Sequence, residues 1–388
     1  MVIGVPRETF PGERRVALTP AVLPNLAKAG FEVLLESGAG VAAGYPDAAY
    51  AAKGARLASA RGDVFQQSGV VVQVLCHGSN DRTGKADLPL LRGGQILAGF
   101  LRPLGSLETI QDIAATGVTA FSVELMPRIT RAQSMDALSA MATIGGYKAV
   151  LLAADRLPRM FPMLTTAAGT ITPARVFVVG AGVAGLQAIA TARRLGAVVS
   201  AYDLRAAAKE QVLSVGGRFV ELPIAAADAQ DARGYARAQD AAFYQRQAEL
   251  LGNQVAESDV VITAAVVPGK KSPVLVTREM VHRMAPGSVI VDLAAERGGN
   301  CEITRAGDVI EADGVTVIGS INLASTVPYH ASQMYARNVS AFLLHLFRGN
   351  KEQPDLEDEI ARETLVTHGG AIVNPRLREF FALAERQK

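Results

Sequence analysis

One short segment restricts the possible folds of this chain more than any other: Val178-Val179-Gly180-Ala181-Gly182-Val183-Ala184-Gly185. An apolar run over residues 176–179, typical of a buried strand, leads into it, and a helical pattern over 184–195 follows and stops at Gly196. In such a unit Gly180 permits a tight turn, Gly182 lets the backbone approach a pyrophosphate, and Gly185 lets helix and strand pack closely. The strand, turn and helix together predict a dinucleotide-binding domain.

The backbone of this turn is expected to bind phosphate. N–H groups at a helix start, here including those of Ala181 and Val183, lack helical partners, and the helix dipole adds about half a positive charge. Asp203 ends the next strand pattern, where a carboxylate accepts hydrogen bonds from ribose hydroxyls and repels a 2′-phosphate, which favours NAD(H) over NADP(H). Arg205 opposes this preference in part, since an arginine can hold a 2′-phosphate. The alternative is a helix-packing glycine motif followed by a surface aspartate.

Apolar strand patterns alternate with helical patterns along most of the chain, which predicts an α/β protein of two doubly wound, Rossmann-like domains with parallel sheets. Strands are expected at 3–6, 31–35, 70–75, 96–100, 118–123, 176–179, 198–202, 218–222, 260–263, 288–292 and 315–318. A helix opened by Thr19 and Pro20 is expected to end at Gly30. A long helical pattern over 326–348 would return the chain to the first domain. We therefore expect residues 1–140 and 326–388 to form an N-terminal domain, and 145–325 to form the NAD(H)-binding domain.

Composition excludes several other classes of protein. Lys and Arg number 39 against 37 acidic residues, so there is no global electrostatic case for nucleic acid. The two cysteines, Cys76 and Cys301, lie far apart and predict neither a disulfide framework nor a metal site. The uncharged run 176–192 contains three glycines and is better explained by strand, turn and helix than by a membrane span. With no signal-like segment at Met1, a cytoplasmic chain is expected.

A polar segment in the first domain also predicts ligand binding. Between Arg128 and Ser139, directly after the strand pattern 118–123, lie two arginines, a glutamine, an aspartate and two serines. Polar groups at the carboxyl end of a strand lie where α/β folds bind ligands. The alternative is a helix start capped by Ser134, with the other side chains solvated.

Several motifs resemble one family closely: the NAD(H)-binding alpha subunits, or domain I components, of proton-translocating NAD(P) transhydrogenases, which are related to alanine dehydrogenase. The resemblance extends over essentially the whole chain. It is carried by Pro6-Arg7-Glu8 with Glu13-Arg14-Arg15-Val16-Ala17-Leu18-Thr19-Pro20, by Arg131-Ala132-Gln133-Ser134-Met135-Asp136-Ala137-Leu138-Ser139, by residues 262–270, and by residues 291–301. Two segments, Leu75-Cys76-His77-Gly78 and Ser320-Ile321-Asn322-Leu323, depart from the family pattern, and no function is carried onto them.

The resemblance implies a role for particular residues. Arg128, Gln133, Asp136 and Ser139 match the loop that positions the nicotinamide and its ribose. Gly234 and Tyr235 lie in a long stretch, 223–240, with almost no bulky apolar residues, and match the family's mobile loop that closes over bound nucleotide. Gln247 and Val266 match positions that line the nucleotide site.

The resemblance also implies partners and a reaction. A hydride passes from NADH on this component to NADP⁺ on a partner subunit, and that step needs no general acid or base, only two nicotinamides held face to face with water excluded. The family further implies a homodimer, an NADP(H)-binding component, and a membrane-spanning component through which the chain attaches peripherally to the inner membrane.

Two other functions remain open at this stage. The first is an alanine dehydrogenase-like, NAD-dependent amino-acid dehydrogenase, which in that family requires a lysine and a histidine in the first domain. Leu75 lies at the strand end where the lysine is expected, and His77 is the histidine that is available nearby. The second is a non-catalytic NAD-binding protein, against which the polar segment 128–139 argues.

Overall fold

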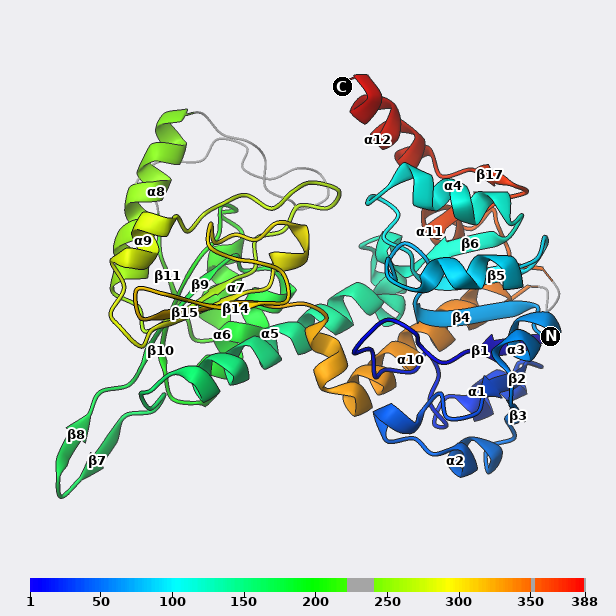
Figure 1. Cartoon of the computed structure of the whole chain (residues 1–388), viewed down its shortest axis with the longest axis horizontal. Helices are drawn as coiled ribbons and strands as arrows, with labels where there is room; N and C mark the ends of the chain where they lie inside the picture. Colours follow the sequence, from blue (N-terminus) through cyan, green and yellow to red (C-terminus); the bar gives the residue numbers. More distant parts are fainter. Residues whose placement is uncertain (222–240, 350–352, 387–388) are drawn as a thin grey trace. The chain divides into compact units, whose positions relative to one another are not determined.

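The computed structural model describes residues 1–221, 241–349 and 353–386. The chain divides into two compact units. Unit 1 comprises Met1–Met141 and Ser325–Lys388, and unit 2 comprises Ala142–Ala324. The chain thus leaves unit 1 once, builds unit 2, and then returns (Figure 1).

Unit 1 is a sheet covered by helices on both faces. Its strands, in the order in which they pair, are β17 (Ala371–Ile372), β16 (Leu365–His368), β6 (Thr119–Ser122), β5 (Ile96–Phe100), β4 (Val70–Leu75), β1 (Val2–Val5), β2 (Glu32–Glu36) and β3 (Arg56–Ala58). Its α-helices are α1 (Leu23–Lys28), α2 (Asp47–Ala51), α3 (Arg61–Gln67), α4 (Leu107–Ala115), α10 (Pro328–Leu346), α11 (Glu359–Thr364) and α12 (Pro375–Arg386).

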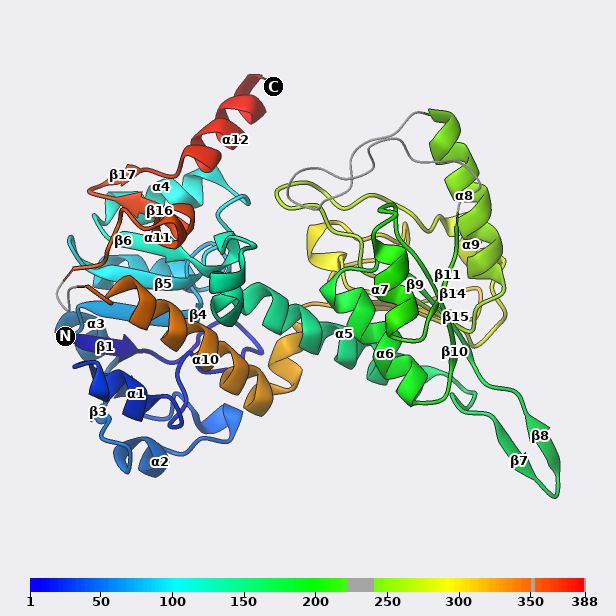
Figure 2. The same cartoon turned by 180° about the vertical axis from the view of Figure 1, so that it is seen from behind.

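Two segments far apart in sequence share the core of unit 1. Helix α10 packs on one face of the sheet, where Tyr335 lies 5.5 Å from Phe100 and Phe342 lies 5.7 Å from Phe121 between ring centroids (Figure 2). Helices α3 and α4 contribute buried side chains to a cluster with β4, β5 and β6. The C-terminal segment is therefore an integral part of this core, because α10 supplies several of its largest buried side chains.

Unit 2 is built on the same plan. Its strands pair in the order β11 (Arg218–Phe219), β10 (Val198–Tyr202), β9 (Arg175–Val179), β12 (Val260–Thr263), β13 (Val289–Asp292), β15 (Val315–Gly319) and β14 (Val309–Ala312). Its α-helices are α6 (Val183–Arg194), α7 (Ala208–Ser214), α8 (Ala241–Ala256) and α9 (Arg278–His282), and α5 (Ala137–Arg156) begins in unit 1 and continues into unit 2.

Successive residues of the central strands of unit 2 enter two different hydrophobic clusters. Val176 and Val178 of β9 join a cluster with α5 and α6, whereas Phe177 and Val179 join a cluster with α8 and α9. A strand covered on both faces buries every side chain, which is why these strands appear in the sequence as continuous apolar runs.

The expected α/β architecture is confirmed, but the sheets are not purely parallel. Strand β16 pairs antiparallel with β6 and with β17, and β14 pairs antiparallel with β15. The turn between β14 and β15 contains Asp313 and Gly314, with φ of 53° and 77°. Two successive residues with positive φ are typical of a type I′ hairpin, and Asp-Gly is a strong sequence signal for it.

The expected helix start at Thr19 and Pro20 is wrong. Helix α1 begins at Leu23 without a side-chain cap, and Pro24 lies in its first turn. A helix opened at Pro20 would place Pro24 in its interior, where proline removes a hydrogen bond and clashes with the preceding turn. The predicted end is confirmed, since Ala29 is the C-cap and Gly30 has φ of 88°.

Strands β7 (Leu164–Thr166) and β8 (Gly169–Ile171) form an antiparallel hairpin that the sequence patterns did not predict. It projects from unit 2, and its strand residues are all exposed (Figure 1).

Among the described residues, α5 alone is long and apolar enough to cross a membrane, judged by length and composition. Its residues Ala149, Val150 and Ala153 are fully buried in the core of unit 2. The run 176–192, considered as a membrane candidate from the sequence, forms β9, the glycine turn and most of α6.

Helix α5 lies very close to the start of α6. A Cβ atom added at Gly146 would lie 2.0 Å from the carbonyl oxygen of Ala184, whereas one added at the preceding Gly145 would meet nothing within 4 Å. Glycine at 146 therefore permits a helix–helix contact that no other residue allows.

We predict opposite effects for two adjacent substitutions in α5. Gly146→Ala should lower the free energy of unfolding by about 1–3 kcal/mol, because the backbones must separate. Gly145→Ala is the matched control and should be neutral or stabilising by up to about 1 kcal/mol, since alanine favours helix. Urea unfolding monitored by circular dichroism measures both, and equal midpoints for the two variants would contradict the close contact.

Candidate functional site

The glycine turn of unit 2 lies where the strand order reverses. Strand β9 pairs with β10 on one side and β12 on the other, and open α/β sheets bind ligands at the carboxyl ends of such strands. Gly180 has φ of 101°, and a Cβ there would lie 2.9 Å from the backbone of both Ala264 and Ala265, which follow β12. Glycine is thus required at 180 by both backbone conformation and space.

The other two glycines have different surroundings. A Cβ at Gly185 would lie 1.8 Å from the carbonyl oxygen of Gly180, so this glycine lets α6 pack against the turn. A Cβ at Gly182 would meet nothing within 4 Å, and Gly182 is the N-cap of α6 with no side-chain cap. The open space before an uncapped helix start fits a pyrophosphate, which accepts hydrogen bonds from the first helical N–H groups. Val183, the first residue of α6, is 41% exposed.

Asp203 directly follows β10 and is held by several donors. Its carboxylate accepts hydrogen bonds from the N–H of Ala181 at 2.8 Å and from the N–H of Arg205 at 2.9 Å. The guanidinium of Arg205 adds two more, at 2.8 Å from Nε and 2.8 Å from Nη2. Ala181, one of the backbone donors predicted for phosphate, therefore directs its N–H at Asp203 instead. Asp203 and Arg205, predicted to have opposite effects on a 2′-phosphate, form one ion pair.

The chain after β12 is fixed by a residue to which the sequence analysis gave no role. The side chain of Asn300 accepts from the N–H of Ala265 at 2.9 Å and donates to the carbonyl oxygen of Ala265 at 2.9 Å. The half-buried Val266 follows directly. Asn300 belongs to the motif over 291–301, so the sequence signal was present, but its partner on another loop was not visible.

Asn300 is positioned in turn by Asp292, a fully buried carboxylate at the end of β13. Asp292 accepts hydrogen bonds from the N–H groups of Ala294, Asn300 and Cys301 and from the Thr304 hydroxyl. The familial motif thus builds a rigid support under the nucleotide-side loop, because a buried carboxylate with four donors is fully satisfied.

Of the remaining predicted residues in unit 2, Gln247 is buried on α8 and donates to the Tyr202 hydroxyl at 2.9 Å. It therefore links α8 to β10, which ends beside Asp203. Gly234 and Tyr235, with the whole stretch 223–240, lie outside the described residues.

The polar segment predicted in unit 1 forms a short 3₁₀ helix, η4 (Thr130–Met135), followed by the start of α5. Asp136, not Ser134, caps α5: its carboxylate accepts from the N–H of Ser139 at 2.9 Å and from the Ser139 hydroxyl at 2.5 Å. Asp136 is the better cap because it directly precedes Ala137, the first helical residue. Gln133 is exposed, and Arg128, which precedes η4, is exposed as well.

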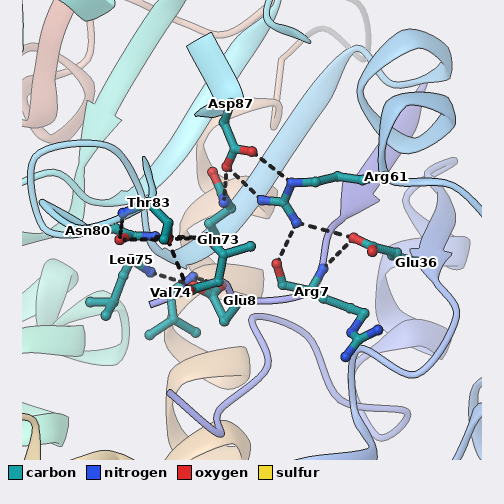
Figure 3. A network of polar contacts seen from close by, with 11 residues as sticks. Arg7, Glu8, Glu36, Arg61, Gln73, Val74, Leu75, Asn80, Thr83 and Asp87 are labelled. Carbon is teal, nitrogen blue, oxygen red and sulfur yellow. Dashed lines mark hydrogen bonds and ion pairs between the residues drawn. The ribbon is translucent and has the colours of Figure 1, made fainter. Parts of the chain in front are cut away.

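Unit 1 has its own crevice where the strand order reverses, between β1 and β4, and the chain itself fills it (Figure 3). The Glu8 carboxylate accepts from the N–H groups of Val74 at 2.6 Å and Leu75 at 3.1 Å. Beside it, the Arg61 guanidinium binds both carboxylate oxygens of Asp87, at 2.7 and 2.6 Å. Leu75, in the segment that departs from the family pattern, thus contributes a backbone donor to this network.

Burial strongly affects the carboxyl groups of this crevice. Desolvation, reinforced by the negative charge of Glu13, raises the pKa of Glu8 to about 8 from a usual value near 4.5. Glu13 and Arg15 form an ion pair at 2.5 Å with side chains 0% and 3% exposed. Removing either partner of such a buried pair would leave an uncompensated charge.

Among residues 1–221, 241–349 and 353–386, no group of three or more His, Cys, Asp or Glu side chains is arranged to hold a metal ion.

The fold and the site define a protein of two α/β units carrying the glycine turn of dinucleotide-binding proteins. Residues 4–145 match the family model "Alanine dehydrogenase/PNT, N-terminal domain", and residues 149–375 match "Alanine dehydrogenase/PNT, C-terminal domain". The chain belongs to the alanine dehydrogenase/PNT family.

Within this family the chain is more similar to transhydrogenase subunits than to alanine dehydrogenases. It is 45% identical over 380 residues to the first of the polypeptides named as NAD(P) transhydrogenase subunit alpha in Rhodospirillum rubrum, covering 97% of this chain and 99% of that one. Alanine dehydrogenase of Bacillus subtilis is 30% identical over 344 residues, or 84% of this chain and 81% of that one. The solved structure of a transhydrogenase from Sinorhizobium meliloti superposes with a TM-score of 0.83 at 41% identity, covering 97% of this chain and 100% of that one. The resemblance predicted from the motifs is confirmed.

We predict that Glu8 makes the stability of the protein depend on pH. Because its pKa is raised on folding, its contribution is fully present below about pH 4.5 and is lost as the pH rises to about 8. The free energy of unfolding of wild type should fall across that range relative to that of Glu8→Gln, which keeps the shape but does not ionise. Urea unfolding of both proteins at pH 5, 6.5 and 8 measures the difference, and parallel curves would show that Glu8 does not titrate there.

Proposed function

We propose that this chain is the NAD(H)-binding subunit of a proton-translocating NAD(P) transhydrogenase, which passes a hydride between NADH and NADP⁺ held on a separate subunit. One observation carries the proposal: the 45% identity to an NAD(P) transhydrogenase alpha-subunit polypeptide over 97% of this chain. The glycine turn supports it, because the space at Gly182 and the uncapped start of α6 suit a pyrophosphate.

Bound NAD(H) would supply the hydride, so the residues of the chain need only bind and orient. In unit 2, Gly182 and the start of α6 would hold the pyrophosphate, and Asp203 would accept the adenosine ribose hydroxyls. In unit 1, the exposed Arg128 and Gln133 would orient the nicotinamide end, and the bond between Asp136 and Ser139 would fix the helix start that follows them. No proton is exchanged with the reacting carbons, so no general acid or base is required.

Amino-acid oxidation fits the crevice of unit 1 less well. That chemistry must move protons, and Leu75 at the end of β4 offers an apolar side chain where alanine dehydrogenases use a lysine. His77, the other candidate, has its Nε2 3.4 Å from a carboxylate oxygen of Asp112. Glu8 occupies the backbone donors at the strand end, where a substrate carboxylate would otherwise bind.

The projecting β7–β8 hairpin supports the proposal of a homodimer. Met163, Leu164 and Ile171 are 61%, 36% and 45% exposed on it. A two-stranded hairpin is marginally stable alone, and apolar side chains on it are stabilised when another surface covers them. The further partners proposed are an NADP(H)-binding component and a membrane-spanning component, through which a cytoplasmic chain would attach peripherally to the inner membrane.

A pair of assays tests the proposed function. The purified chain, mixed with a separately purified NADP(H)-binding component, should transfer hydride from NADH to NADP⁺. The chain alone, given NAD⁺ and L-alanine, should produce no NADH. The reverse pattern would instead identify an amino-acid dehydrogenase, and inactivity in both assays with intact NADH binding would identify a non-catalytic binder.

We predict that NADH binds at least about tenfold tighter than NADPH, a difference of roughly 1.4 kcal/mol. Asp203→Ala should weaken NADH binding, because it removes the ribose acceptor and the acceptor of the Ala181 N–H. It also frees the Arg205 guanidinium to attract a 2′-phosphate, so NADPH binding should tighten. In the double variant with Arg205→Ala that gain should disappear. Calorimetry measures all three proteins, and equal wild-type affinities for the two nucleotides would refute the assignment.

We predict that Gln133 affects hydride transfer more than binding. Gln133→Asn should leave NADH affinity within about threefold but slow transfer to the partner by at least about tenfold, because a shift of about 1 Å near the reacting carbons has such an effect. The exposed Gln111 on α4 provides the same chemical change as a control, and Gln111→Asn should alter neither. Stopped-flow transfer at saturating NADH gives the rate. Loss of NADH binding with normal transfer in saturated protein would make this segment a binding element only.

A further inference from the structure

The segment proposed to orient the nicotinamide is tied to the C-terminal part of unit 1 by a forked ion pair. Arg131, in η4, donates from Nη1 to Asp358 at 2.9 Å and from Nη2 to Glu359 at 2.8 Å. The two acceptors lie more than two hundred residues further along the chain, at the start of α11. The planar guanidinium reaches both at once, which restricts its orientation more than a single contact would.

Asp358 is held firmly enough to act as an anchor. Its side chain is 5% exposed, and its carboxylate also accepts from His345 Nε2 at 2.8 Å, from Arg348 Nη2 at 2.9 Å and from the N–H of Ile360 at 2.8 Å. Burial alone would raise the pKa of Asp358, but the hydrogen bonds from His345 and Arg131 outweigh it and lower the pKa well below its usual range. The carboxylate is thus ionised throughout the physiological range.

A second contact holds η4 from another helix. Asn338 on α10 donates from Nδ2 to the carbonyl oxygen of Ser134 at 2.8 Å. Ala132 and Met135 turn inward and are 1% and 6% exposed. Gln133 lies between these fixed points with its side chain in solvent, so the backbone of η4 decides where its amide is presented.

We propose that Arg131, Asp358 and Glu359 form a clamp that positions the 128–139 segment for hydride transfer. The three are positioning residues, since they act through the backbone of η4. The proposal rests on the proposed function of that segment. Together with the Asp136 cap downstream, the clamp fixes η4 at both ends, which is the arrangement that precise orientation of a reacting group requires.

A merely stabilising role would have a different signature. Arg131 and Glu359 are 44% and 51% exposed, and exposed ion pairs contribute about 0–1 kcal/mol to stability. Removing the fork should therefore alter the melting temperature little. A selective loss of the transfer rate would come from misplacement of η4, because neither the stability of the chain nor its affinity for NADH depends strongly on this contact.

The experiment compares Arg131→Ala, Arg131→Lys and a control, Arg56→Ala. Arg56 is 54% exposed and pairs with Glu32 in unit 1, away from η4. At saturating NADH, Arg131→Ala should slow single-turnover hydride transfer at least about fivefold, with NADH affinity within about threefold of wild type. Arg131→Lys keeps the charge without the fork and should be intermediate. Arg56→Ala should match wild type in both measurements.

Amide hydrogen exchange supplies a readout that does not depend on hydride transfer. The N–H groups of Ala132 and Asp136 donate within the segment, to Ile129 and Gln133. Their exchange should accelerate at least about fivefold in Arg131→Ala and remain unchanged in Arg56→Ala. Unchanged exchange, or a wild-type transfer rate in Arg131→Ala, would overturn the clamp. Wild-type protein that transfers no hydride would overturn the proposed function, and the exchange result would still decide whether the clamp holds η4.

Discussion

The contact between Gly185 and the carbonyl oxygen of Gly180 is the constraint on which unit 2 depends. It brings α6 directly against the end of β9, and an added methyl group at 185 would lie 1.8 Å from that oxygen. Helix α5 uses the next available space, with Gly146 against Ala184 in the first turn of α6. Because these backbones touch without intervening side chains, the start of α6 is placed with little freedom, and its N–H groups keep one direction toward a bound phosphate.

The two units use the same crevice differently. In unit 2 the space beside Gly182 is open, and the surrounding loops are fixed from behind by Asn300 and Asp292. In unit 1 the equivalent strand ends are bonded to Glu8. A carboxyl group of the chain thus takes the hydrogen bonds that a ligand carboxylate would make. This difference gives a physical reason for one nucleotide-binding unit and one unit whose contribution comes from the edge of its sheet, through η4.

Several polar residues in the predicted site also serve the structure around them. Asp203 holds the glycine turn through Ala181, and Asp136 caps α5. Such residues bind or orient a ligand with less loss of conformational entropy, because folding has already fixed their side chains. Substitutions at these positions therefore combine an effect on the ligand with an effect on the backbone, which is why the double variant at Asp203 and Arg205 is more informative than either single change.

The sequence by itself determined the α/β class, the central strands and the glycine turn, because these depend on local periodicity and on neighbours within one strand–turn–helix unit. It also contained signals that were overlooked, such as Pro24 against a helix start at Pro20 and Asp313-Gly314 for the β14–β15 hairpin. Only the tertiary structure decided that Glu8 fills the crevice of unit 1, that Asn300 supports Ala265 and that Asp358 meets Arg131. Each of these contacts joins segments distant in sequence, and hydrogen bonding between side chains leaves no periodic pattern, so their partners are set by how the chain packs.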